Sequence, residues 1–316
     1  MSDIHGRTDL FDEMLSKIDF SKDDKLYILG DICDRGGGLD TLIRVRNLCT
    51  NPTSNIELIM GNHEKNLLDM LVAFYRVQSF KSFNEVVAKI ERLKNSVNSN
   101  KFTSLLNNVA RVSLKQTINP VNVIYRNYGI KLGFTNGFIA DDLNKMEKNE
   151  TDSLIKFLIE LKTYKKISVN GKDYILVHGG YSDDQKDNEE YLLTIRDTFF
   201  DSDQAIIPDN TTVIFGHTTT RDIRAKIEHQ LVYPYTIWHG KNKIGIDCAA
   251  SFVGGRLACL RLDDMQEFYV DNKRDCIVPV SIRNEKMKSL WEYEKKVVDK
   301  YRDIYDENDI LFNRNK

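Results

Sequence analysis

Residues 30–36, Gly-Asp-Ile-Cys-Asp-Arg-Gly, decide how this chain is interpreted. They directly follow residues 25–29, Lys-Leu-Tyr-Ile-Leu, a short apolar run that predicts a buried strand. The stretch therefore carries two carboxylates and a guanidinium to the end of a strand. A carboxylate there could hold or bridge metal ions, and an arginine could grip an anion through two parallel hydrogen bonds. A plain surface turn is the alternative, and the rest of the chain weighs against it.

Three further apolar runs also end in polar groups. In addition, two chelating side chains near the N-terminus are spaced so that they point the same way in an extended segment. Without the rest of the set, that segment would read as a solvated N-terminus. The polar groups are Asp3 and His5 at the N-terminus, Asn62 and His63 after residues 56–60, His178 after residues 174–177, and His217 after residues 212–215.

Loops at the carboxyl ends of strands converge in open α/β sheets, so these side chains are expected to meet. Mixed imidazole, carboxylate and amide ligands suit a two-metal hydrolytic site with Mn²⁺, Fe or Zn²⁺. They do not suit structural zinc, which prefers closed sets of Cys and His. Asp31 is the second carboxylate of the set and is the natural bridge between two ions. The predicted ligands are Asp3, His5, Asp31, Asn62, His178 and His217.

Composition favours a folded protein, with 41% hydrophobic and 29% charged residues in 316. The net charge of −2 gives no bulk attraction to nucleic acid or to an anionic membrane, so neither is expected as a partner. The five cysteines are scattered without a Cys-x-x-Cys pair, which favours free thiols in a reducing compartment. No apolar run approaches the roughly 20 residues of a membrane helix. A cytoplasmic location is therefore predicted, and the oligomeric state is left open.

The motifs resemble those of the calcineurin-like metallophosphoesterase superfamily, and within it the phosphoprotein phosphatase type. Members carry Asp-x-His-Gly, Gly-Asp-x-x-Asp-Arg-Gly, Gly-Asn-His-Glu, His-Gly/Ala-Gly and Gly-His in that order. Here the same motifs stand at residues 3–6, 30–36, 61–64, 178–180 and 216–217, and the resemblance spans about residues 1–270.

The resemblance implies a role for each matching residue. Two divalent ions, most simply Mn²⁺, would activate a bridging water that attacks phosphorus in line with the leaving oxygen. His63 would protonate the leaving group while Asp34 orients its ring. Arg35 and Arg196, with Asn62, would hold the phosphate. Arg196 rests on the loosest match, an arginine on a predicted helix between the last two motifs.

The implied fold is α/β, a four-layered α/β/β/α sandwich of two mixed sheets. Residues 1–283 would form this domain, and residues 65 to about 166, with a helical pattern, would be an insertion in it. Residues 284–316 would be a C-terminal amphipathic helix and tail, more simply packed on its own domain than dimerising.

The resemblance implies hydrolysis of phosphomonoesters, with phosphoserine or phosphothreonine in proteins as the first choice of substrate. A dinucleoside polyphosphate hydrolase is similar at the same motifs and is the alternative enzyme. A third hypothesis is an inactive member that binds phosphorylated or nucleotide ligands. Its motive is that the chain starts two residues before Asp3, where family members have an apolar strand. A loosely held carrier for Asp3 and His5 would weaken the first metal site.

Overall fold

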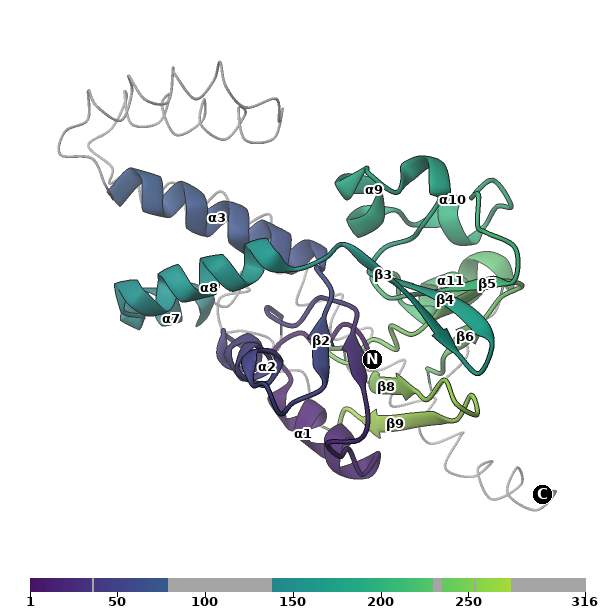
Figure 1. Cartoon of the computed structure of the whole chain (residues 1–316), viewed down its shortest axis with the longest axis horizontal. Coiled ribbons are helices and arrows are strands. Elements are labelled where there is room, and N and C mark those ends of the chain that lie inside the picture. The colour runs from purple at the N-terminus through teal and green to yellow at the C-terminus, as the bar shows by residue number, and fades with distance from the viewer. Residues whose placement is uncertain (36, 79–137, 230–234, 253, 274–316) are drawn as a thin grey trace.

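The computed structural model describes residues 1–35, 37–78, 138–229, 235–252 and 254–273 (Figure 1). This part of the chain is a mixed α/β structure, as the sequence predicts at the level of class. Its helices are α1 (Thr8–Lys17), α2 (Asp40–Thr50), α3 (Asn62–Gln78), α7 (Phe138–Lys145), α8 (Lys148–Glu160), α9 (Glu189–Thr194), α10 (Asp197–Phe200) and α11 (Thr220–Ile227), with a 3₁₀ turn at Asp183–Gln185. Its strands are β1 (Leu26–Ile28), β2 (Ile56–Leu58), β3 (Tyr164–Val169), β4 (Lys172–Val177), β5 (Thr211–Phe215), β6 (Trp238–His239), β7 (Lys243–Gly245), β8 (Arg256–Leu260) and β9 (Glu267–Asp271).

The strands described form three sheets. The largest has the order β3-β4-β5-β7-β6, in which β4, β5 and β7 are parallel and the two outer strands are antiparallel. Strands β1 and β2 pair in parallel, and β8 and β9 form an antiparallel pair. Parallel strands need crossover connections, and the chain supplies them as helices between β1 and β2 and between β4 and β5.

Three clusters of buried apolar side chains pack these helices and strands together. One packs α1, α2, α3 and α8 against β1 and β2, and it includes Leu257 of β8. A second joins Leu29 and Ile59 to the large sheet through Leu176 and Ile214. The third packs the opposite face of the large sheet against α9, α10 and α11. The clusters place helices against β1 and β2 and against one face of the large sheet, while the four-layered sandwich itself stays a prediction.

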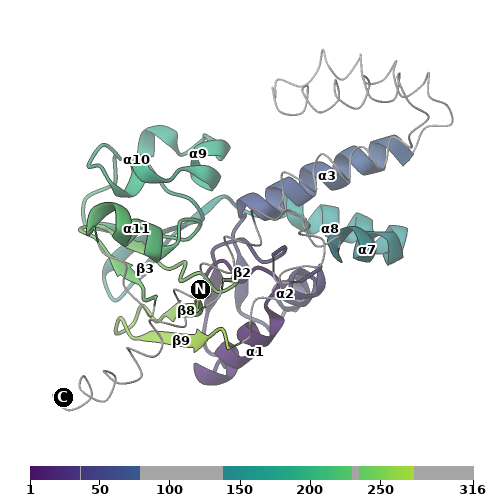
Figure 2. The same ribbon diagram turned by 180° about the vertical axis from the view of Figure 1, so that it is seen from behind.

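The N-terminal segment runs alongside β1 and the residues that follow it. Hydrogen bonds join Leu29 N to Met1 O at 2.9 Å, Asp3 N to Gly30 O at 3.1 Å and His5 N to Asp31 O at 2.9 Å. Both views place the N-terminus inside the molecule, between the β1–β2 and β8–β9 pairs (Figures 1 and 2). Ile4 is completely buried in the first apolar cluster. The expectation of a loosely held carrier is therefore not borne out, because backbone hydrogen bonds and burial fix this segment.

The predicted helical insertion is described only in part. Helices α3 and α8 lie side by side and project from the body in both views (Figures 1 and 2). The helical pattern ends at Glu160 rather than near residue 166, because Tyr164–Val169 pairs with β4 as a strand. The other helices predicted between residues 79 and 137, and the C-terminal helix over 285–305, lie outside the described residues. Among the helices that the structure describes, none is long and apolar enough to cross a membrane.

The buried position of Ile4 can be tested by truncation. Replacing Ile4 by Ala should lower the free energy of unfolding by about 2–4 kcal/mol, since the lost apolar contacts leave a cavity. Urea denaturation followed by circular dichroism measures this loss. The matched control is Ile159→Ala, because Ile159 is 62% exposed and its truncation should cost less than about 0.5 kcal/mol. Equal effects of the two truncations would contradict the packing of the N-terminal segment described above.

Candidate metal centre

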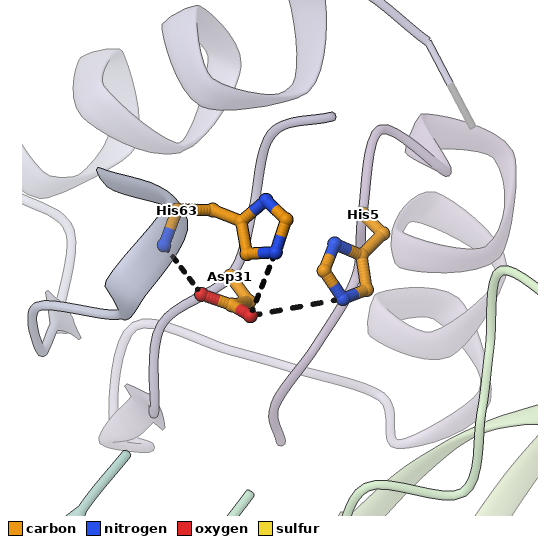
Figure 3. Close-up of side chains that lie close together, drawn as sticks. All are labelled: His5, Asp31 and His63. Carbon is orange, nitrogen blue, oxygen red and sulfur yellow. Dashed lines mark hydrogen bonds and ion pairs between the residues drawn. The ribbon is translucent and has the colours of Figure 1, made fainter. Parts of the chain in front are cut away.

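Asp31 lies at the centre of the site, in the turn that follows β1 (Figure 3). Its Oδ2 atom is 3.7 Å from Nε2 of His5 and 3.6 Å from Nε2 of His63. Its Oδ1 atom accepts a hydrogen bond from the backbone N–H of His63 at 3.0 Å. The three side chains offer ligand atoms within 4.8 Å of one another, so they could hold one metal ion.

A second group with the same spacing shares the Asp31 carboxylate. Nε2 of His178 lies 3.3 Å from Asp31 Oδ1 and 2.9 Å from Oδ1 of Asn62. The ring of His217 is next to that of His178, with centroids 5.0 Å apart. Asp31, His178 and His217 again offer ligand atoms within 4.8 Å of one another. One carboxylate thus belongs to two potential metal sites, which is the geometry of a bridging ligand.

Asp3 connects the two groups. Its Oδ1 atom is 3.7 Å from Nε2 of His5, and its Oδ2 atom accepts the backbone N–H of His217 at 3.0 Å. The hydroxyl of Ser2 also donates to Oδ2. The structure therefore brings together all the predicted ligands, namely Asp3, His5, Asp31, Asn62, His178 and His217.

The predicted proton donor lies within the first group. His63 Nδ1 is 3.0 Å from Oδ2 of Asp34, and the two side chains form an ion pair when the imidazole is protonated. Burial by itself disfavours a charged imidazole, but Asp31 and Asp34 outweigh it and raise the pKa of His63. The geometry also allows His63 to act as a ligand, because its Nε2 faces Asp31.

The two predicted phosphate-binding arginines come from separate parts of the chain, and Arg196 lies between α9 and α10 rather than on a helix. The positive charge of Arg35 is close enough to help lower the pKa of His5, after burial, the larger cause. Arg196 donates from Nη1 to the carbonyl of His217 at 2.8 Å and to the Thr218 hydroxyl at 3.2 Å. Arg196 therefore also positions the loop that carries His217.

Burial makes the charges of the site depend on one another. Burial disfavours the charged imidazole of His178, but the carboxylates of Asp31 and Asp3 raise its pKa to about 9. Burial and the neighbouring His178 lower the pKa of His217 to about 2. Burial alone would raise the pKa of Asp31, but His178 and His63 hold it well below its usual value. At neutral pH these shifts favour an ionised Asp31, a protonated His178 and a neutral His217.

The backbone is unusual at the same positions. Several site residues adopt the left-handed conformation, which costs a non-glycine residue about 1–3 kcal/mol. They are Asp3, His5, Asp31, Asp34, Arg35 and His217, with φ between 50° and 75°. The turn after β1 also approaches the turn after β2 closely, and a Cβ on Gly61 would overlap the backbone nitrogen of Asp31. Side chains at these positions are directed by the turns rather than by regular strands.

Glu64 fixes the two turns that carry Asp31 and His63. This carboxylate in the first turn of α3 is completely buried. Its Oε2 accepts the N–H groups of Asp31 at 2.7 Å and Gly61 at 3.2 Å. Its Oε1 accepts those of Ile32 at 2.8 Å and Cys33 at 3.4 Å.

Sequence reasoning missed three residues at the site. Glu64 was quoted within its motif but given no role. Asp247, buried just after β7, lies near Asp3, and burial followed by the Asp3 charge raises its pKa well above the usual value. Its signal in the sequence was the same as elsewhere, a carboxylate that ends an apolar run. Phe252, in the loop before β8, faces Arg35.

The role of Glu64 is testable with a nearly isosteric change. Glu64→Gln replaces one acceptor oxygen by an NH₂ group that faces two backbone donors, so it should lower the free energy of unfolding by about 2–4 kcal/mol. The control is Glu57→Gln, because Glu57 pairs with Lys165 near the surface and should cost less than about 1 kcal/mol. Chemical denaturation measures both variants, and a Glu64 variant as stable as the control would rule out the anchoring role.

The protonated state of His178 predicts that metal binding depends on pH. A metal ion must displace the proton, so Mn²⁺ affinity should rise by about tenfold per pH unit from pH 6.5 towards 9. Isothermal titration calorimetry in two buffers with different ionisation enthalpies should also detect proton release. His239→Asn, at an exposed histidine paired with Glu267, should keep the same slope. An affinity independent of pH across this window would contradict a protonated His178.

Comparisons with known proteins agree with these motifs. A family model described as calcineurin-like phosphoesterase matches residues 1–244. A symmetrical bis(5′-nucleosyl)-tetraphosphatase from Delftia acidovorans is 38% identical over 69 residues, which are 22% of this chain and 24% of that protein. One of the same description from Haemophilus ducreyi is 30% identical over 95 residues, 30% of this chain and 34% of that protein. The chain thus spans about a third or less of these relatives.

Among solved structures, a hypothetical protein from Pyrococcus horikoshii aligns over 94% of this chain and 95% of its own, with 11% identity and a TM-score of 0.40. The family model, by contrast, extends through every motif that supplies a candidate ligand, from Asp3 to His217. The chain belongs to the calcineurin-like phosphoesterase family.

Proposed function

We propose that this chain is a metal-dependent hydrolase of phosphate esters or phosphoanhydrides, with two divalent ions at the site around Asp31. The observation that carries the proposal is the shared carboxylate, because Asp31 belongs both to the group with His5 and His63 and to the group with His178 and His217. Two ions held by one bridge suit in-line displacement at phosphorus, since both the entering and the leaving oxygen are stabilised.

The residues present fit such ions. The candidate ligands are nitrogen and oxygen donors, and Asp3 and Asp31 are each only 1% exposed. Buried carboxylates this close together need positive charge nearby, which divalent cations supply. Asp3, His5 and Asp31 would hold one ion, and Asp31, Asn62, His178 and His217 the other, with His63 close to the first. Mn²⁺ is the ion we propose, with Fe or Zn²⁺ as alternatives.

Bound ions would lower the pKa of a coordinated water and offset charge on the phosphate. The protein groups do the rest. Arg35 and Arg196 bind the non-bridging phosphate oxygens. Their positive charges offset the repulsion between these oxygens and the nearby carboxylates. His63, whose pKa is raised by Asp31 and Asp34 against the opposing effect of burial, donates a proton to the leaving oxygen. Asp34, 3.0 Å from His63, holds the ring and stabilises its charge.

For the substrate, we propose a dinucleoside polyphosphate, the alternative in the sequence analysis, ahead of phosphoserine or phosphothreonine. Both partial relatives are named as tetraphosphatases of this kind, and neither supports the protein phosphatase. The inactive binder loses its motive, because the segment that carries Asp3 and His5 is buried and hydrogen-bonded. We also propose that the three apolar clusters are the layer interfaces of the four-layered sandwich and that the protein acts in the cytoplasm.

The first experiment measures Mn²⁺-dependent hydrolysis of diadenosine tetraphosphate beside phosphate release from a phosphothreonine peptide. We expect hydrolysis of the nucleotide, and we expect Asp31→Asn to reduce it at least 100-fold, because both metal sites lose their shared ligand. Asp152→Asn, on the exposed surface of α8, is the control and should retain full activity.

The two substrates separate the hypotheses. Release from the peptide alone would return the assignment to the protein phosphatase. Metal-independent turnover, or an Asp31→Asn variant that stays active, would contradict the two-metal site itself. Binding of nucleotide without any hydrolysis would support the inactive member of the family.

A further inference from the structure

One aromatic side chain, Phe252, lies at the edge of the site beside Arg35, in the segment that follows Asp247. The Phe252 N–H donates to the carbonyl of Ala249 at 2.9 Å, and the Phe252 carbonyl accepts from Gly255 N at 3.0 Å. The side chain of Asn272, itself 3% exposed, donates to the Phe252 carbonyl at 2.9 Å. These hydrogen bonds hold the backbone of Phe252, and its ring takes no part in them.

The ring of Phe252 lies beside Arg35, a side chain that we assign to phosphate binding. The guanidinium carbon of Arg35 lies 5.4 Å from the ring centroid, within the range of a cation–π contact. The charge of Arg35 also acts on two histidines of the site. After burial, the larger cause, it lowers the pKa of His5, and it acts against the rise in the pKa of His63. The Phe252 ring therefore lies directly beside a side chain that we assign to phosphate binding.

Packing among the residues that the structure describes leaves the ring of Phe252 partly exposed. Phe252 is 38% exposed, and its ring belongs to none of the three buried apolar clusters. Among the residues that the structure describes, the other large apolar side chains this exposed are Ile159 and Ile206. Of these three, Phe252 alone contacts a residue of the candidate site.

We propose that Phe252 is a stacking platform for the nucleobase of the substrate, next to the phosphate that Arg35 holds. This inference rests on the proposed nucleotide substrate and assigns a position to its base. Every nucleobase has a flat π-face that can stack on an aromatic ring, whatever hydrogen-bonding groups are at its edge. Stacking therefore favours nucleotides without selecting one base. In a nucleotide only a ribose lies between the base and the phosphate, so the two groups are neighbours. The Phe252 ring and the Arg35 guanidinium are neighbours as well. A phosphopeptide carries no such flat group.

The competing role for Phe252 is to support Arg35 by the cation–π contact alone. A supporting residue would affect every phosphate substrate equally, whereas a platform would affect only substrates with a base. Inorganic tetraphosphate offers the same phosphate chain as diadenosine tetraphosphate but no base. The ratio of kcat/KM for the two substrates therefore distinguishes the roles.

The test compares Phe252→Ala and Phe252→Trp with the unmodified protein in Mn²⁺. We expect Phe252→Ala to lower the ratio of kcat/KM for diadenosine tetraphosphate over inorganic tetraphosphate by about tenfold or more, mainly through KM, and Phe252→Trp to restore it. Equal losses on both substrates would overturn the platform and leave the support of Arg35. A ratio that does not change would overturn it as well.

A binding measurement keeps this inference separate from the proposed activity. The fluorescence of 2-aminopurine riboside 5′-monophosphate is quenched when its base stacks. The unmodified protein with Mn²⁺ should quench it with saturation, and Phe252→Ala should weaken that binding by about tenfold. If the protein hydrolyses neither tetraphosphate but still quenches the probe through Phe252, the activity fails and the platform stands. Quenching that is equal in the Ala variant overturns the platform.

Discussion

The carboxylate of Glu64 is the contact on which the geometry of the site depends. It accepts backbone N–H groups from the turn after β1 and from the turn after β2. Since these donors lie at the ends of neighbouring parallel strands, no ladder partner remains for them there. One buried side chain at the start of α3 therefore replaces a backbone partner for both turns. This anchor, together with the hydrogen bond from the His63 N–H to Asp31 Oδ1, fixes the relative position of Asp31 and His63.

Such an anchor explains how left-handed residues persist at the site. Asp31, Asp34 and Arg35 each have a positive φ in the same turn, a cost that surrounding contacts must outweigh. The hydrogen bonds to Glu64 and the pairing of His5 N with Asp31 O supply those contacts on both sides of the turn. In return, successive side chains leave the backbone in directions that no regular strand allows. Asp31 can then face two groups of imidazoles at once.

Much of the site could be predicted from the sequence because Asp31, Asn62, His178 and His217 each come after an apolar run that forms a strand. The rule that carboxyl ends of strands converge was sufficient to group Asp31, His178 and His217. It did not identify Glu64 or Phe252, because their roles depend on contacts between separate loops. It also misjudged the N-terminal segment, since a short stretch without an apolar run showed no signal of its pairing beside β1. The helical boundary near residue 166 was displaced because the pattern of Tyr164–Val169 alternates only weakly.

The electrostatics of the site follow from the same convergence. His178 and His217 are neighbours, yet the pKa of the first rises to about 9 and that of the second falls to about 2. Burial disfavours a charge on both rings. Asp31 and Asp3 outweigh burial at His178, and the charge gained there adds to the effect of burial on His217. A proton on His178 thus provides the positive charge that the buried carboxylates require before metal binds. Metal and proton compete for one role, which ties the loading of the site to pH.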